Sequence, residues 1–178
     1  MRTNLSSQIT LTRVSKKYYQ PDDVFELSRV TRYEKIQTEI FENELTGAKH
    51  IATEIAKLIT EKKQRNEQCV IGLTNGKTHV GIYNELVRLH KEEKLSFVNV
   101  IFVNLFEFYP LHKNLKGSLS KLNELLFKYI DVLPENILSP NVSVDKSEIM
   151  EECKNYERKI AELGGIDFQI LGIGRSGN

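Results

Sequence analysis

The sequence has 178 residues, of which 40% are hydrophobic and 28% are charged, and its formal net charge is +1. This composition is typical of one globular domain or of part of a larger one. It excludes the strongly basic surface with which proteins bind nucleic acid or an anionic membrane, and no apolar run approaches the roughly 20 residues of a transmembrane helix.

The first half of the chain predicts an extension followed by alternating strands and helices. Residues 1–33 show little periodicity, so we predict an N-terminal extension there and a folded domain over residues 34–178. Apolar and polar residues alternate over Ile36–Phe41, which predicts a strand. The apolar positions of Leu45–Lys63 fit one face of a helix. Cys69–Leu73 is almost wholly apolar, which predicts a strand covered on both faces.

The second half continues this alternation. Further helices are predicted over Thr78–Glu93, Leu115–Tyr129 and Lys146–Leu163, and buried strands over Val98–Leu105 and Ile166–Ile173. Alternating strands and helices build a mostly parallel sheet flanked by helices, so we predict a three-layer, Rossmann-like α/β fold. Because a buried parallel strand is normally followed by a covering helix, we expect the domain to be incomplete at its C-terminus.

Two cysteines, Cys69 and Cys153, lie far apart in the sequence and have no neighbouring metal ligands. We therefore expect reduced thiols, a cytoplasmic location, no bound metal and no cofactor. Cys69 lies in an apolar strand and is predicted to be a small core residue.

Three loops follow the predicted strands at their carboxyl ends, where open α/β sheets bind ligands. The first loop opens a helix, and the free N–H groups at a helix N-terminus attract phosphate. Its candidate phosphate-binding residues are consecutive: Thr74, Asn75, Gly76, Lys77 and Thr78. The alternative is an ordinary helix start, in which a Thr or Asn side chain caps the helix.

The second and third loops, Phe106–Leu111 and Gly174–Asn178, contain further candidates. Glu107 follows a buried strand among aromatic residues, and a partly desolvated carboxylate suits general acid or base catalysis. The alternative is a carboxylate that caps a turn or pairs with a lysine. In the third loop, Gly174 allows close backbone approach and Arg175 suits a phosphate or carboxylate, although an Arg in such a loop commonly faces solvent.

Together these loops resemble the motifs of one enzyme family. Gly72–His79 resembles a Gly-Leu-x-Thr-Gly-x-Thr-Pro loop, and Asn104–Phe108 resembles an Asn-Met-Asp-Glu-Tyr segment. Gly164–Asp167 reads Gly-Gly-Ile-Asp, and Gly172–Asn178 resembles a Gly-Ile-Gly-x-Asp-Gly-His loop. These motifs resemble those of the glucosamine-6-phosphate deaminase/isomerase family, which is related to the 6-phosphogluconolactonases. The resemblance runs from about Glu34 to the end of the sequence.

The resemblance implies that the ligand is a phosphorylated amino sugar and that the third loop, including Ser176 and Asn178, contributes to its site. The family reaction converts an aldose amino-sugar phosphate into a ketose phosphate and releases ammonia. This chain departs from the family where protons are transferred: Phe106 replaces the base Asp, and Ser176 and Asn178 replace the Asp and His that serve ring opening. In the first loop, His79 stands where the family has Pro.

Three functional hypotheses follow. The first is a divergent isomerase or deaminase with Glu107 as its acid or base; the second is a non-catalytic sensor or regulatory domain that binds a sugar phosphate; the third is a structural domain of a longer protein. The replaced residues favour the second over the first for the family's own reaction, and the preserved phosphate loop argues against the third. No nucleic-acid or membrane partner is expected, and the resemblance is compatible with a homo-oligomer of unspecified order.

Overall fold

The computed structural model describes residues 38–111 and 116–173. The chain divides into two units, Met1–Gly47 and Ala48–Asn178. The predicted boundary after residue 33 lies outside the described residues. Within the described ranges, no helix combines the length and the apolar character that crossing a bilayer requires.

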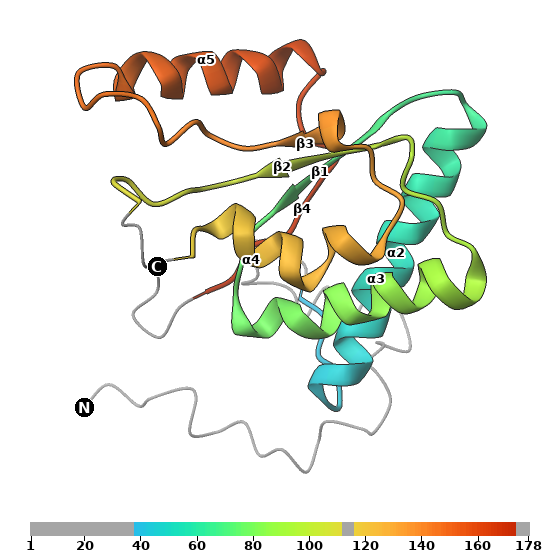
Figure 1. The fold of residues 1–178 in the computed structure, drawn as a ribbon. Helices are drawn as coiled ribbons and strands as arrows, with labels where there is room; N and C mark the ends of the chain where they lie inside the picture. Colours follow the sequence, from blue (N-terminus) through green and yellow to red (C-terminus); the bar gives the residue numbers. More distant parts are fainter. Residues whose placement is uncertain (1–37, 112–115, 174–178) are drawn as a thin grey trace, which may run out of the picture. The chain divides into compact units, whose positions relative to one another are not determined.

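Helices and strands alternate along the second unit and form a parallel α/β sheet (Figure 1). The strands are β1 (Cys69–Leu73), β2 (Val100–Asn104), β3 (Ile137–Leu138) and β4 (Phe168–Gln169), and the helices are α2 (Glu44–Gln64), α3 (Val80–Glu93), α4 (Ser118–Leu125) and α5 (Ile149–Glu162). The strand order is β3-β2-β1-β4, and all three pairings are parallel. The predicted fold class is therefore confirmed.

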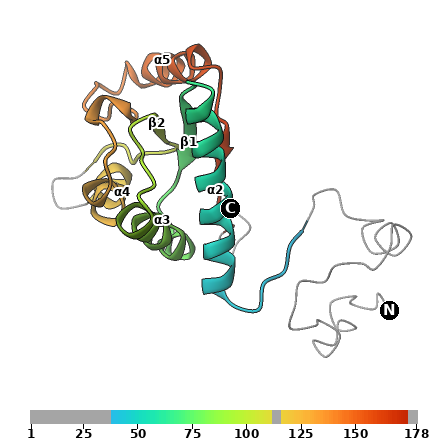
Figure 2. The same ribbon diagram turned by 90° about the vertical axis from the view of Figure 1, so that its right-hand side faces the viewer.

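The two central strands separate two hydrophobic clusters. Every residue of β1 and β2 is buried, and alternate side chains point to opposite faces, as the pleat of a strand requires. Cys69, Ile71 and Phe102 pack on the face covered by α2, α3 and α4, whereas Val70 and Ile101 pack on the face covered by α5. Figures 1 and 2 both show α5 on one side of the sheet and the other three helices on the opposite side.

Small residues allow two of these helices to approach closely. A side chain added at Gly81 of α3 would place its Cβ only 3.1 Å from the Cβ of Ala48 in α2.

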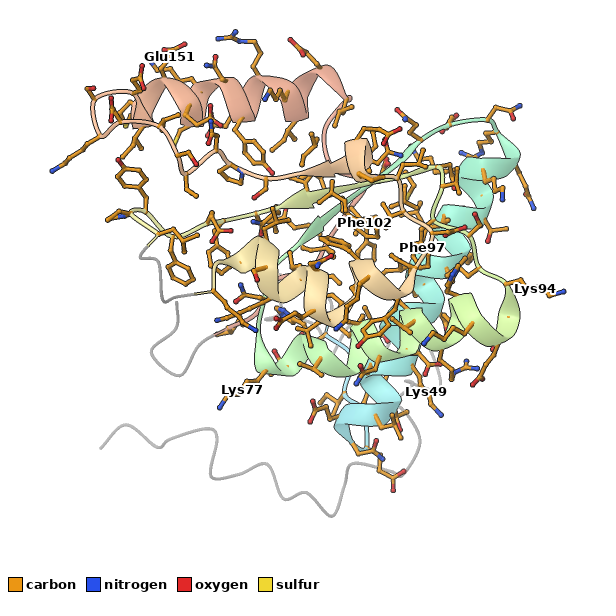
Figure 3. The ribbon with its side chains drawn as sticks, in the orientation of Figure 1. Lys49, Lys77, Lys94, Phe97, Phe102 and Glu151 are labelled. Atoms are coloured by element: carbon orange, nitrogen blue, oxygen red, sulfur yellow. The ribbon has the colours of Figure 1, made fainter. Side chains whose placement is uncertain are left out.

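Deeper in the same layer, Phe97 and Phe102 stack obliquely with ring centroids 6.0 Å apart, between the sheet and the helices (Figure 3). The thiol of Cys69 is fully buried, as predicted, and desolvation raises its pKa to about 12.

Two strand predictions need correction. Residues 38–41, the described part of the predicted strand Ile36–Phe41, form no strand, and Ile40 is 57% exposed. An alternating pattern produces a strand only where a neighbouring strand accepts its hydrogen bonds. The strand predicted over Ile166–Ile173 is limited to β4, because its ladder with β1 pairs only Phe168 and Gln169, and Ile173 is 91% exposed.

Other differences concern element ends and one short strand. The helix predicted over Leu115–Tyr129 ends at Leu125 and is followed by a 3-10 turn over Phe127–Tyr129. The two-residue strand β3 was not predicted, because it is too short to show any periodicity. The remaining helices and central strands agree with the prediction to within a few residues at each end.

Candidate functional site

The loop after β1 enters a 3-10 turn over Lys77–His79 and then α3. Neither the turn nor the helix has a side chain that caps its N-terminus. The alternative interpretation, in which a Thr or Asn of this loop caps the helix, is therefore wrong. The polar side chains of the loop have other partners or none.

Thr74 is the centre of a small hydrogen-bond network at the start of this loop. Its Oγ1 lies 3.0 Å from Nδ1 of His79 and 3.5 Å from the carbonyl oxygen of Ile170. The phenol of Tyr83, buried in α3, donates a hydrogen bond to the Thr74 carbonyl oxygen. Burial raises the pKa of Tyr83 well above its usual range, although its hydrogen bond to Thr74 opposes this effect, so the phenol remains a neutral donor.

His79 was not among the predicted binding residues, yet it lies at the centre of the site. Its side chain is only 4% exposed and sits between two glycines. A Cβ added at Gly76 would lie 3.1 Å from its Nδ1, and a Cβ added at Gly172 would lie 3.1 Å from its Nε2. Both glycines thus leave room for the imidazole ring, and at this residue the first loop meets the backbone of Gly172, just after β4.

Within the part of the chain that the structure describes, two buried polar atoms of the first loop have no hydrogen-bond partner. They are Nδ2 of Asn75 and Nε2 of His79. A buried polar group without a partner costs about 1–3 kcal/mol of stability, and native structures contain few of them. Orphaned polar atoms in the loop that faces the carboxyl ends of the strands are typical of a site completed by a ligand or water.

The other predicted residues of this loop are open to solvent. Lys77 and Thr78 are exposed, and the Lys77 side chain extends away from the start of α3 (Figure 3). A binding role for Lys77 and Thr78 stays a prediction.

The end of β2 contains a second buried network, which sequence reasoning did not assign to a role. Asn104 is 1% exposed; its Oδ1 accepts a hydrogen bond from the Ser118 hydroxyl (2.8 Å), and its Nδ2 donates to the Ser139 hydroxyl (2.9 Å). The phenol of Tyr156 in α5 donates to the Asn104 carbonyl oxygen at 2.9 Å. Three segments are therefore fixed to the end of β2.

Glu107 binds the N-terminus of α4. Its Oε1 accepts hydrogen bonds from the N–H groups of Phe108 (3.0 Å) and Ser118 (2.6 Å), and its Oε2 accepts one from the N–H of Leu119 (2.9 Å). A Cβ added at Gly117 would come within 2.7 Å of this carboxylate, so the glycine makes room for it. The capping alternative is confirmed, and a catalytic role for Glu107 stays a prediction.

Beside Glu107 the loop exposes aromatic rings. Phe106, 36% exposed, packs edge to face against Phe108 with the ring centroids 5.6 Å apart. The backbone of this loop lies beside the first loop, because the N–H of Leu105 donates to the carbonyl oxygen of Leu73 at 3.0 Å. The first and second loops therefore leave the sheet side by side.

Four predicted residues of the third loop, Gly174, Arg175, Ser176 and Asn178, lie outside the described residues. Residues 38–111 and 116–173 contain no group of three His, Cys, Asp or Glu side chains that could bind a metal ion. A groove lined mainly by Lys, Thr and Glu side chains with a few apolar ones, from α2 and from the end of α3 onward, lies at the opposite end of the strands and contains none of the predicted site residues.

Comparison with known proteins relates this chain to enzymes that act on sugar phosphates. Residues 42–177 match the family model described as glucosamine-6-phosphate isomerases/6-phosphogluconolactonase. A glucosamine-6-phosphate deaminase-like protein of Bacteroides thetaiotaomicron is 48% identical over all of this chain and 27% of its own length. A glucosamine-6-phosphate deaminase of Clostridium botulinum (strain Langeland) is 39% identical over 69% of this chain.

Solved structures agree. A monomeric glucosamine-6-phosphate deaminase superposes with a TM-score of 0.69 and 36% identity, over 76% of this chain and 54% of that one. The 6-phosphogluconolactonase of Thermotoga maritima superposes with a TM-score of 0.58 over 71% of this chain and 56% of that one, and at 20% identity it shows a shared fold alone. The chain spans 50% of the length of the Clostridium relative.

Proposed function

Since this chain belongs to the family of glucosamine-6-phosphate isomerases and 6-phosphogluconolactonases, we propose that the protein binds a phosphorylated amino sugar in the loop between β1 and α3. One observation carries the proposal: this loop opens a helix without a side-chain cap and contains buried polar atoms that have no partner among the described residues. A phosphate at that position would accept hydrogen bonds from the loop and would interact favourably with the helix dipole.

We further propose that binding, rather than the deaminase reaction of the family, is the role of this site. Phe106 stands at the position where the family resemblance expects a basic Asp, and a phenyl ring transfers no proton. The neighbouring carboxylate of Glu107 is engaged by three backbone N–H groups. These contacts favour a sensor or regulatory domain over a divergent enzyme, with the sugar phosphate as its ligand.

Isothermal titration calorimetry on the full-length protein tests the proposal, with glucosamine 6-phosphate, fructose 6-phosphate and unphosphorylated glucosamine as ligands. We expect binding of a phosphosugar and no binding of glucosamine. Gly76→Val should abolish binding, because even its Cβ would lie 3.1 Å from the His79 ring. Absence of binding for every phosphosugar would contradict the proposal.

An ammonia-release assay on the same protein separates the sensor from the enzyme. We expect binding without turnover. Ammonia release by the wild type would instead indicate an enzyme. If this release disappears in Glu107→Gln when the two proteins are compared at an equal folded fraction, the carboxylate of Glu107 is the catalytic group.

A further inference from the structure

The two nitrogens of the His79 imidazole differ in their contacts within the described residues. Nδ1 lies 3.0 Å from Oγ1 of Thr74, whereas Nε2 is buried and has no hydrogen-bond partner among residues 38–111 and 116–173. The ring is 4% exposed and is enclosed by the backbone at Gly76 and Gly172.

The neighbours of the ring decide which nitrogen carries the proton. The Thr74 carbonyl oxygen, 3.2 Å from Nδ1, already accepts the Tyr83 phenol. The Thr74 hydroxyl has one other acceptor, the Ile170 carbonyl oxygen at 3.5 Å, and is better placed to donate to Nδ1. In neutral imidazole one nitrogen accepts and the other donates, so a Thr74 hydroxyl that donates to Nδ1 places the hydrogen on Nε2 and makes it an unused donor.

This donor lies where the first loop meets the backbone of Gly172, just after β4. The point at which a Cβ of Gly172 would stand is 3.1 Å from Nε2 of His79 and 3.9 Å from Oγ1 of Thr78. Both polar atoms therefore face the same region beside the N-terminus of α3. An N–H and a hydroxyl that converge at a helix N-terminus suit an anionic oxygen.

We propose that His79 is a ligand-binding residue whose Nε2–H donates a hydrogen bond to a phosphoryl oxygen of the bound sugar phosphate. The proposal rests on the function proposed above and adds a residue to it. The family-like motif has Pro at this position, which lacks any side-chain donor, so the contact distinguishes this chain from the pattern it otherwise resembles. Toward His79, Thr74 and Tyr83 serve as positioning residues: Thr74 contacts Nδ1, and the Tyr83 ring packs edge to face against the imidazole with the ring centroids 6.2 Å apart.

Two substitutions separate the nitrogens of His79 in the full-length protein. The amide of Asn reaches about as far as Nδ1, so His79→Asn retains the contact with Thr74 and loses the distal donor. The longer His79→Gln places an amide N–H near the position of Nε2. We expect His79→Asn to weaken binding of glucosamine 6-phosphate about tenfold or more and His79→Gln to retain most of the affinity. His90→Gln is the matched control, because His90 bonds to the Leu95 carbonyl oxygen at the other end of α3.

Nuclear magnetic resonance distinguishes a ligand-binding role of His79 from a purely structural one, because only a binding role makes the Nε2 signal respond to phosphate. In protein with 15N-labelled histidine, His79 is identified by the signal that disappears in His79→Asn. We expect its shifts to indicate the tautomer with hydrogen on Nε2, and we expect the Nε2 signal to move when inorganic phosphate is added but not when sodium chloride is added at the same ionic strength. The titration itself uses the wild-type protein, and if the Asn variant folds poorly, His79→Gln provides the same signal assignment.

Each other outcome overturns the inference in a recognisable way. If the wild type binds the phosphosugar and both His79 variants bind it equally well, His79 is no ligand and the proposed function still stands. If His79→Asn weakens binding of the phosphosugar but leaves binding of inorganic phosphate unaffected, the contact is with a sugar hydroxyl and the phosphoryl assignment is wrong. If the wild type binds neither phosphosugar nor phosphate, the proposed function fails and this inference fails with it.

Discussion

Glu107 fits two roles by its residue type, and only its surroundings in the fold decide between them. A carboxylate after a buried strand fits a general base and fits equally well a helix cap. Its three backbone hydrogen bonds and the space left by Gly117 identify the capping role. The negative charge also interacts favourably with the positive end of the α4 dipole.

We therefore predict that Glu107→Gln lowers the free energy of unfolding by about 1 kcal/mol, since a neutral amide accepts weaker hydrogen bonds from the helix. Urea denaturation monitored by circular dichroism measures the change. Glu157→Gln is the matched control, because Glu157 is exposed on α5 and the same substitution there should leave the stability within about 0.5 kcal/mol of the wild type. Equal stability of the two variants would contradict the capping role.

At the scale of elements, one carboxylate connects α2, β1 and the segment leading into β4. Asp167 accepts a hydrogen bond from the N–H of Val70 at 2.9 Å and forms an ion pair with Lys62 at 2.8 Å. Burial alone would raise the pKa of Asp167, but the hydrogen bonds from Lys62 and Val70 outweigh it and hold the pKa below its usual value. The ionised carboxylate is thus favoured by the folded state.

The sign of this shift predicts how stability depends on pH. A carboxyl group with a lowered pKa in the folded state contributes stability above its unfolded pKa of about 3.9, and this contribution is lost as the pH falls through the folded value. We expect Asp167→Asn to lower the free energy of unfolding by about 1–2 kcal/mol at pH 7 and by much less near pH 2. Urea denaturation across this range tests it, with Asp145→Asn in an exposed loop as the control. A deficit that stays constant from pH 7 to pH 2 would show that the charge of Asp167 is not responsible.

At the scale of the whole domain, the two sides of the sheet are covered unequally. Helices α2, α3 and α4 enclose the larger cluster, whereas α5 covers the other face with Tyr156 as its only buried residue. The buried members of the smaller cluster are Val70, Ile101, Val103 and Tyr156. Regions with little buried apolar surface open first.

We predict that the amides of α5 exchange their hydrogens at least about tenfold faster than those of α3, which corresponds to about 1.4 kcal/mol in opening free energy. Tyr156→Phe should accelerate exchange in α5 further, because it removes the hydrogen bonds from the phenol to the carbonyl oxygens of Asn104 and Leu138. Exchange in α3 should remain unchanged in this variant. Uniform exchange across both helices would contradict the prediction. Hydrogen–deuterium exchange with mass spectrometry provides the measurement.

Local patterns in the sequence were sufficient for the two central strands, for the helices and for the positions of the loops that follow β1 and β2. A short apolar run such as Cys69–Leu73 can be satisfied only as a strand covered on both faces, and the periodicity of Leu45–Lys63 fits only an amphipathic helix. Because parallel strands place their carboxyl ends at one edge, the position of the candidate site also followed from the order of the elements. The family motifs then indicated a phosphate-binding loop there, and the family model supports that family assignment.

Contacts between distant residues required the tertiary structure. Whether Glu107 was a base or a cap depended on a helix that begins 11 residues later, and the end of β4 depended on how many residues find a partner in β1. His79 had no local signal of importance. Its burial, its contact with Thr74 and its unused nitrogen arise because Gly172, far away in the sequence, leaves space for the ring. Propensity and periodicity are local quantities, whereas burial and hydrogen-bond partnership are properties of the packed chain.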